Sequence, residues 1–454
     1  MKGAAPSLNR PPWLAAAGLA ALVAGTIAWA VWPGYMSYDS LLAWDQARYG
    51  VQTALWPPLH TYLFQLSLAA GAGAGGLLAV QLFLLVFGAV LAIRMLVPRR
   101  ALGWTLALLF LAGLAYFPPL LGSMLAHWRD VPTAAFALMG LALWLAAAER
   151  RSPVLLVAAI LSFGVSLGLR YNALVLVAPA LALMVWRPYL GAPARGWTRA
   201  LVVAVVALSL GLAWASTQWR LPDGVKLPNP GGLGGAQLFD LIGVSACSGR
   251  NHLPPAVSGG QPVTIAQLRR AYDPRHLQMT LAPRPGVPRL VETDAAGAVP
   301  QVWREVLVTE APCYIAHRSA VFVEQMGMAR TGVFYPVHGG VDPNPHGLAL
   351  ARPQTALKLN AYIRAHADEW ARRPFLLYAA AAGLGLLAAR RDRRLGLLIL
   401  ALLAGAFAYP ALLFVAAPAA DARYIFPSNV LSLLIALASL GVLAGPGHRG
   451  RRHG

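Results

Sequence analysis

Ten long apolar runs divide this chain of 454 residues, and they constrain its fold more than any motif does. They cover residues 13–31, 77–97, 101–121, 131–148, 153–169, 172–186, 200–219, 374–389, 395–416 and 424–444. A helix needs about 17–25 apolar residues to cross the hydrocarbon core of a membrane, and most of the runs have that length. Charged residues make up only 12% of the chain, against about a quarter of an ordinary soluble domain. The sequence therefore predicts an all-α polytopic membrane protein.

The basic residues indicate which connections face the cytoplasm. The formal charge of +20 is concentrated in short connections and the C-terminal tail, at 99–100, 150–151, 187–199, 390–394 and 448–452. Short loops rich in Lys and Arg lie on the cytoplasmic side, so the alternate connections are predicted to be external. This distribution argues against nucleic acid as a partner, and the expected partners of the apolar spans are membrane lipids.

The segment 57–70 decides how many crossings there are. It is apolar but short, and counting it as a span would place Arg99 and Arg100 outside and invert every later loop. We therefore expect a re-entrant or interfacial helix and ten crossings, with eleven spans as the alternative.

The stretch 220–373 differs from the rest of the chain in its Pro/Gly clusters and in holding both cysteines, Cys247 and Cys313. It is long enough for one small domain. We expect an N-terminal transmembrane module at 1–219, a mixed external domain at 220–373, and the last three spans with a basic tail at 374–454. A pair of cysteines in an oxidising compartment can form a disulfide, and two thiols alone make a poor metal site. The sequence leaves this bridge open.

Two carboxylates lie at the predicted external border of the membrane. Asp39 follows the first apolar run, and Asp130 directly precedes the fourth. A carboxylate at a membrane rim is costly unless it is solvated or used, so both are candidate catalytic residues. The alternatives are that Asp39 caps the next helix, and that Asp130 caps its span or pairs with Arg129.

Four arginines share that predicted border: Arg129, Arg170, Arg318 and Arg423. The planar guanidinium can pair with an anionic group through two hydrogen bonds, so these residues are candidate binding residues. The alternative is that they are border arginines whose charged ends reach for water.

Several short motifs occur in order on the predicted external side. They are Tyr38-Asp39-Ser40, Trp56-Pro57-Pro58-Leu59-His60, His127-Trp128-Arg129-Asp130-Val131-Pro132, Arg170-Tyr171-Asn172, Pro312-Cys313-Tyr314-Ile315-Ala316-His317-Arg318 and Asp421-Ala422-Arg423-Tyr424. This order resembles the GT-C glycosyltransferases, which include the protein O-mannosyltransferases and the transferases that modify lipid A. The resemblance implies an enzyme of the bacterial inner membrane. It would move a sugar from a polyprenyl-phosphate donor to an envelope lipid, glycan or protein acceptor on the external face.

The resemblance also implies roles for individual residues. Asp39 would be the base of an inverting single displacement, with Asp130 as the second catalytic carboxylate. The four border arginines would bind the donor phosphate: Arg129, Arg170, Arg318 and Arg423. The remaining polar side chains of the motifs are expected to contact substrate: Tyr38, His60, Asn172, His317 and Tyr424. His60 has a structural alternative as a hydrogen-bonded histidine.

Other functions and a metal stay open at this point. The sequence contains no dedicated metal-binding set, and a divalent cation is an open alternative. A transporter or flippase of a lipid-linked substrate, and a scaffold that presents the external domain, are the competing functions.

Overall fold

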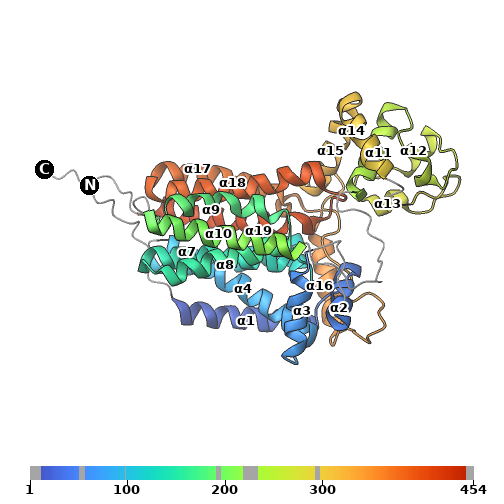
Figure 1. The fold of residues 1–454 in the computed structure, drawn as a ribbon. Coiled ribbons are helices and arrows are strands. Elements are labelled where there is room, and N and C mark those ends of the chain that lie inside the picture. The colour runs from blue at the N-terminus through green and yellow to red at the C-terminus, as the bar shows by residue number, and fades with distance from the viewer. Residues whose placement is uncertain are drawn as a thin grey trace.

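The structure is a computed structural model that describes residues 12–50, 57–97, 99–190, 196–217, 234–291 and 297–445. Ten of its helices coincide with the ten predicted apolar runs: α1 (Trp13–Val31), α4 (Gly73–Leu96), α5 (Arg100–Tyr116), α7 (Asp130–Arg150), α8 (Pro153–Leu169), α9 (Ala173–Trp186), α10 (Gly196–Thr217), α17 (Phe375–Arg391), α18 (Arg393–Ala416) and α19 (Phe426–Ala444). Most of them lie side by side in one bundle (Figure 1). The run 101–121 also includes the start of α6 (Pro118–Met124), which is bent by 87° from α5.

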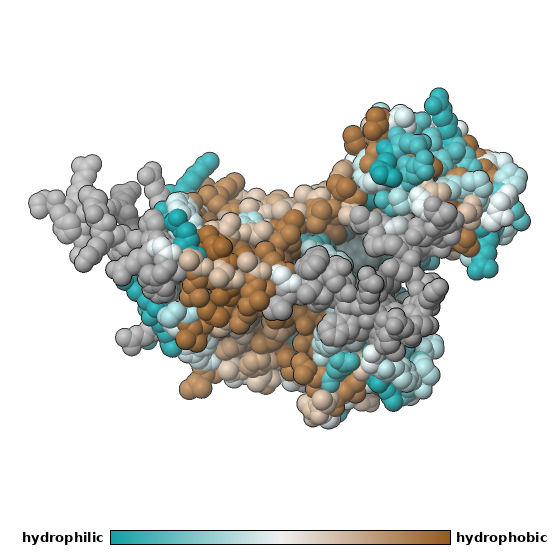
Figure 2. Space-filling view, in the orientation of Figure 1, coloured by the Kyte–Doolittle hydropathy of each residue, from teal (hydrophilic) through white to brown (hydrophobic). Residues whose placement is uncertain are grey.

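The bundle has the surface of a membrane protein. Among the described residues, five helices are long and apolar enough to cross a membrane, or six if the bent pair is one span. Apolar residues cover the side of the bundle, and polar residues gather toward its ends (Figure 2). The prediction of an all-α polytopic membrane protein is confirmed. The number of ten crossings stays a prediction.

Small residues allow the helices of the bundle to approach closely. Every fourth residue of α1 from Ala16 to Ala28 is a buried alanine, and this stripe faces the neighbouring α4. On α4, a Cβ placed at Gly88 would lie 2.7 Å from the backbone nitrogen of Met139 on α7. Only glycine fits at this contact, and small residues at helix contacts are the usual basis of packing in membranes.

The short segment after α2 (Tyr38–Tyr49) is the helix α3 (Leu59–Ala69). α3 has 11 residues and is therefore about 16 Å long, roughly half the thickness of the hydrocarbon core. This length supports an interfacial helix over an eleventh span. Trp56, which precedes it, lies outside the described residues.

A group of short helices has a hydrophobic core of its own. It contains α11 (Gly234–Ser248), η1 (Pro255–Ser258), α12 (Ile265–Ala271), α13 (Leu277–Leu281), α14 (Ala298–Thr309) and α15 (Ala311–Gln325). Phe239, Ile242 and Val306 are buried in this core. Figure 1 shows the group at one end of the bundle, called the domain end below.

The end of the predicted domain packs elsewhere. α16 (Pro353–His366) joins the core of the bundle through Ala356 and Ile363, and η3 (Trp370–Arg372) leads into α17. Residue 220, the predicted start of the domain, lies outside the described residues. The boundaries 220 and 373 therefore stay a prediction.

A disulfide holds the small domain together. It joins Cys247 of α11 to Cys313 of α15, with 5.6 Å between the Cα atoms. This settles the bridge that the sequence left open. It closes a loop over a sequence separation of 66 residues, and bridging a long loop restricts the unfolded chain.

Candidate active site

Two loops at the domain end are joined by backbone hydrogen bonds. Tyr35 N–H donates to the carbonyl of Leu125, and His127 N–H donates to the carbonyl of Tyr35. His127 Nε2 also donates to the carbonyl of Pro33, at 2.8 Å. A Cβ at Gly34 would lie 2.5 Å from that nitrogen, so glycine is required here. The start of α2 is thereby fixed beside the start of α7.

The contact between these two loops is extended by one side-chain hydrogen bond and by a third loop, which contains Gly340 and Asp342. The indole of Trp128 donates to Ser37 Oγ at 3.0 Å, one residue before α2. Met36 N–H donates to the carbonyl of Gly340, and Asp342 N–H donates back to Met36. Asp39 therefore lies where three segments distant in sequence meet.

Asp39 forms an ion pair with Arg423 of η4 (Ala422–Ile425), with 2.9 Å between Oδ2 and Nη2. The same guanidinium reaches Asp421, with 3.3 Å between Nε and Oδ2. α2 begins at Tyr38, and the Asp39 carboxylate points to the arginine and is not the cap of its helix. Arg423 thus holds two carboxylates.

A second ion pair joins Arg170 to Asp130, which lies in the first turn of α7. Asp130 is buried, and Arg170 is its ion-pair partner across the cluster. The ring of Tyr424 lies 5.3 Å from the Arg170 guanidinium and 5.1 Å from that of Arg423. Tyr424 therefore joins the two pairs into one cluster at the domain end.

The neighbouring charges shift the pKa values of Asp39 and Arg129, which lie outside the spans. Burial raises the pKa of the Asp39 carboxyl, but Arg423, Arg129 and Arg170 lower it further, so that the pKa falls below its usual value. Burial also lowers the pKa of the Arg129 guanidinium to about 10, although Asp39 acts against it. Asp39 is therefore an ionised carboxylate among three cations.

Asp421 has the opposite shift. Burial raises the pKa of its carboxyl above the usual value, and the neighbouring Arg423 and His276 only partly offset this. The environments of Asp39 and Asp421 thus separate the pKa values of two carboxyls that share one arginine.

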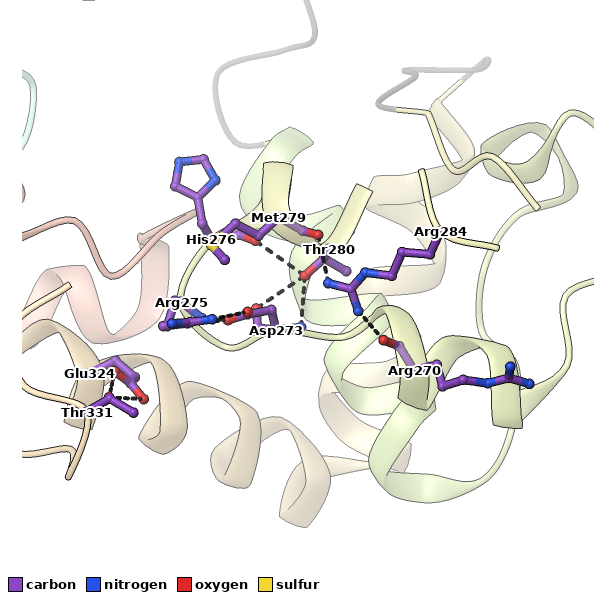
Figure 3. Close-up of polar contacts among 9 residues, drawn as sticks. All are labelled: Arg270, Asp273, Arg275, His276, Met279, Thr280, Arg284, Glu324 and Thr331. Atoms are coloured by element: carbon purple, nitrogen blue, oxygen red, sulfur yellow. Dashed lines mark hydrogen bonds and ion pairs between the residues drawn. The ribbon is translucent and has the colours of Figure 1, made fainter. Parts of the chain in front are cut away.

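The small domain holds the connection between α18 and α19 that carries Asp421. Ala420 N–H donates to the carbonyl of Arg275, and Leu277 N–H donates to the carbonyl of Pro418. Figure 3 shows how Asp273, Arg275 and Thr280 brace this turn of the domain, while the His276 ring points away from them. His276 Nε2 lies 4.0 Å from Asp421 Oδ1.

Arg318 and His317 form a different group, in the core of the small domain. Arg318 is fully buried, with Nε 2.6 Å from Asp240 Oδ1, and its Nη1 donates to the carbonyl of Ala417 at 2.7 Å. His317 Nε2 lies 3.2 Å from the same Asp240 oxygen. The other ring nitrogen, Nδ1, shares a hydrogen bond with the Tyr272 hydroxyl. These contacts occupy the Arg318 guanidinium and connect the domain to the end of α18.

The other predicted substrate residues are dispersed around the cluster. Tyr38 is 70% exposed. Asn172 lies beside Tyr409 of α18. His60 is buried against Phe64, and within the described residues neither of its ring nitrogens has a hydrogen-bond partner.

Three residues of the cluster were not predicted as site residues. Asp421 belongs to the motif that contains Arg423, and its place beside a cation was the available indication. The ring of Trp128 lies 4.9 Å from the Arg423 guanidinium carbon. Tyr335 stands 6.0 Å from Trp128, and its backbone φ of 50° is in the left-handed region.

Among the described residues, no group of three or more His, Cys, Asp or Glu side chains is placed to hold a metal ion.

A solved structure is similar to this chain. The chain is similar to ArnT from Cupriavidus metallidurans, whose crystal structure has undecaprenyl phosphate bound. The TM-score is 0.33 and the identity 13%, and the match covers 94% of this chain and 77% of ArnT. No protein-family model and no curated protein matches the sequence. At this level of likeness, the function is inferred from the residues of the chain itself.

Proposed function

We propose that this protein is a membrane glycosyltransferase that moves a sugar from a polyprenyl-phosphate donor to an envelope lipid, glycan or protein. The observation that carries the proposal is the cluster of arginine–carboxylate pairs at the domain end of a membrane bundle. Arg423 and Arg170 supply fixed positive charge, and Asp39 supplies a carboxylate within the same cluster.

The surroundings of the cluster suit a ligand with an anionic head and an apolar tail. An apolar pocket lies between α7, α8, α9, α18 and α19. Its lining includes Ala134 and Pro427, each four residues, or about one helical turn, beyond Asp130 and Arg423. The bundle is therefore apolar on the membrane side of the arginines, as the isoprenoid chain of a bound lipid phosphate requires.

The chemistry follows from these positions. The acceptor hydroxyl attacks the anomeric carbon, and Asp39 takes the hydroxyl proton as the new C–O bond forms. The bond from the anomeric carbon to the phosphate oxygen breaks, and the polyprenyl phosphate leaves with its charge stabilised by Arg423 and Arg170. A single displacement of this kind inverts the configuration at the anomeric carbon.

The position of the cluster favours an enzyme over a transporter. Transporter binding sites lie near the middle of the bilayer, between repeated halves. Here Asp130 is in the first turn of α7, and Arg423 directly precedes α19. The charges therefore lie at one face of the bundle, as a reaction on that face requires.

Binding of the lipid phosphate that leaves in the reaction tests the proposal. Arg423→Ala should weaken binding of undecaprenyl phosphate by roughly 10–100-fold, because a charge-assisted hydrogen bond is worth about 1.5–3 kcal/mol. The measurement is a titration of purified protein in lipid nanodiscs. Arg352→Ala is the matched control, since Arg352 is an arginine that stacks on Trp29 outside the cluster. Equal affinity of Arg423→Ala and the intact protein would remove the phosphate site.

The external position of the cluster gives a separate prediction. Reporter fusions after Arg100, Arg151, Arg199 and Arg394 should report the cytoplasm, because these connections carry the basic residues. Fusions after Asp130 and near Pro300 should report the outside. A cytoplasmic signal at Asp130 together with an external signal at Arg100 would contradict this orientation and the ten-span arrangement.

A further inference from the structure

The two carboxylates that share Arg423 are held in different ways. Asp421 contacts Nε and its side chain is 4% exposed, whereas Asp39 contacts Nη2 and its side chain is 28% exposed. A ligand entering from solvent would therefore reach the Asp39 side of the guanidinium first.

The backbone around Asp421 is held by hydrogen bonds on both sides of the residue. Its neighbours Ala420 and Ala422 donate hydrogen bonds to the carbonyls of Arg275 and Phe334, and Tyr424 N–H donates to the carbonyl of Asp421 itself. These bonds anchor Asp421 between the small domain and α19. Asp39 instead projects from the first turn of α2, so its contact with Arg423 can be exchanged by a change of side-chain rotamer.

We propose that the donor phosphate replaces Asp39 on Arg423 Nη2 while Asp421 keeps its hold on Nε. This inference rests on the proposed function and adds an order of events to it. Asp421 is then a positioning residue, because it keeps the guanidinium in place through the exchange. Donor binding releases the Asp39 carboxylate, which becomes available to accept the proton of the acceptor hydroxyl.

The exchange has a chemical reason. A carboxylate paired with a guanidinium is a weaker proton acceptor than the same carboxylate alone, because the cation stabilises the ionised form. The donor phosphate is a diester that carries one negative charge, as the carboxylate does, and its two free oxygens can pair with arginine through two hydrogen bonds. The base would therefore be activated only when the donor occupies the site.

The experiment is a titration of undecaprenyl phosphate against purified full-length variants in lipid nanodiscs. Asp39→Asn removes the competing anion and should tighten binding by roughly 3–30-fold, the range between an exposed and a partly buried ion pair. Asp421→Asn should give no comparable tightening, since the phosphate does not displace Asp421. If Asp39→Asn folds poorly, Asp39→Ser removes the same charge and serves instead.

Two controls separate competition from other effects. Asp45→Asn removes another negative charge from α2 and should change the affinity by less than about twofold, because exposed charges are screened over about a Debye length. Undecaprenol, which lacks the phosphate, should bind the Asp39 variant and the intact protein equally.

The outcomes distinguish this inference from the proposed function. If the intact protein does not bind undecaprenyl phosphate, the proposed function fails. If it binds, but Asp39→Asn binds equally or more weakly, the exchange is overturned and the proposed function stands. Equal tightening by Asp421→Asn, or tightening toward undecaprenol, would also overturn the exchange.

Discussion

Asp39→Asn should lower sugar transfer by about 10²–10⁴-fold, the usual contribution of a positioned general base. The amide keeps the size of the side chain and can still accept a hydrogen bond from Arg423, but it cannot take a proton. The fall should therefore appear in kcat, and binding of the lipid phosphate should not weaken. The measurement uses protein in nanodiscs and lipid-linked sugar extracted from a strain that lacks the gene.

Two comparisons make this result specific. Asp45→Asn changes a carboxylate of the same helix that pairs with His346, and it should transfer sugar at nearly the rate of the intact protein. Transfer by Asp39→Asn at that same rate would remove Asp39 as the base. Loss of folding in Asp39→Asn would instead show that the Asp39–Arg423 pair is needed for structure.

Arg318→Met should destabilise the protein by about 3–5 kcal/mol, the usual cost of leaving a buried charge without its partner. Both Arg318 and Asp240 are fully buried, and the guanidinium also holds the carbonyl of Ala417. The change is measured by chemical unfolding. The exposed Arg304 of α14 provides the control, because Arg304→Met should have almost no effect.

A double variant tests the reason for that loss. Arg318→Met with Asp240→Leu leaves no unpaired charge, so it should be more stable than Arg318→Met alone. The opposite finding for the single variant, full stability with loss of donor binding, would return Arg318 to the phosphate site that the sequence predicted.

The helices of the membrane part were predictable because crossing a membrane imposes a length. Each of the ten apolar runs coincides with a helix, and the short run at 57–70 corresponds to the short α3. Pro118 and Pro119 also indicate why the run 101–121 does not continue straight, since the chain bends by 87° before α6.

The pairing within the cluster could not be predicted in the same way. The sequence places Asp39, Asp130, Arg170 and Arg423 on one side of the membrane, but it does not say which helix ends meet. The backbone hydrogen bonds of Tyr35 and Met36 bring those helix ends together. A few such bonds between loops leave no recognisable pattern in the sequence.

Arg318 shows the limit of reasoning from motifs. It occurs at the predicted border within a motif of polar residues, and its partner Asp240 lies in a helix that no pattern singled out. Asp421 lies two residues before Arg423, and the motif that contains both was assigned a role through Arg423 alone. Asp421 was therefore not predicted as a site residue.

The central claim is that the cluster around Asp39 and Arg423 transfers a sugar from a polyprenyl-phosphate donor. The most direct test is mass spectrometry of envelope lipids and glycans from a deletion strain, complemented by the intact chain or by Asp39→Asn. We expect the deletion strain to accumulate a polyprenyl-phosphate-linked sugar and to lack that sugar on one envelope component. The intact chain should restore the component, and Asp39→Asn should not. Unchanged lipids and glycans in the deletion strain, or full restoration by Asp39→Asn, would contradict the claim.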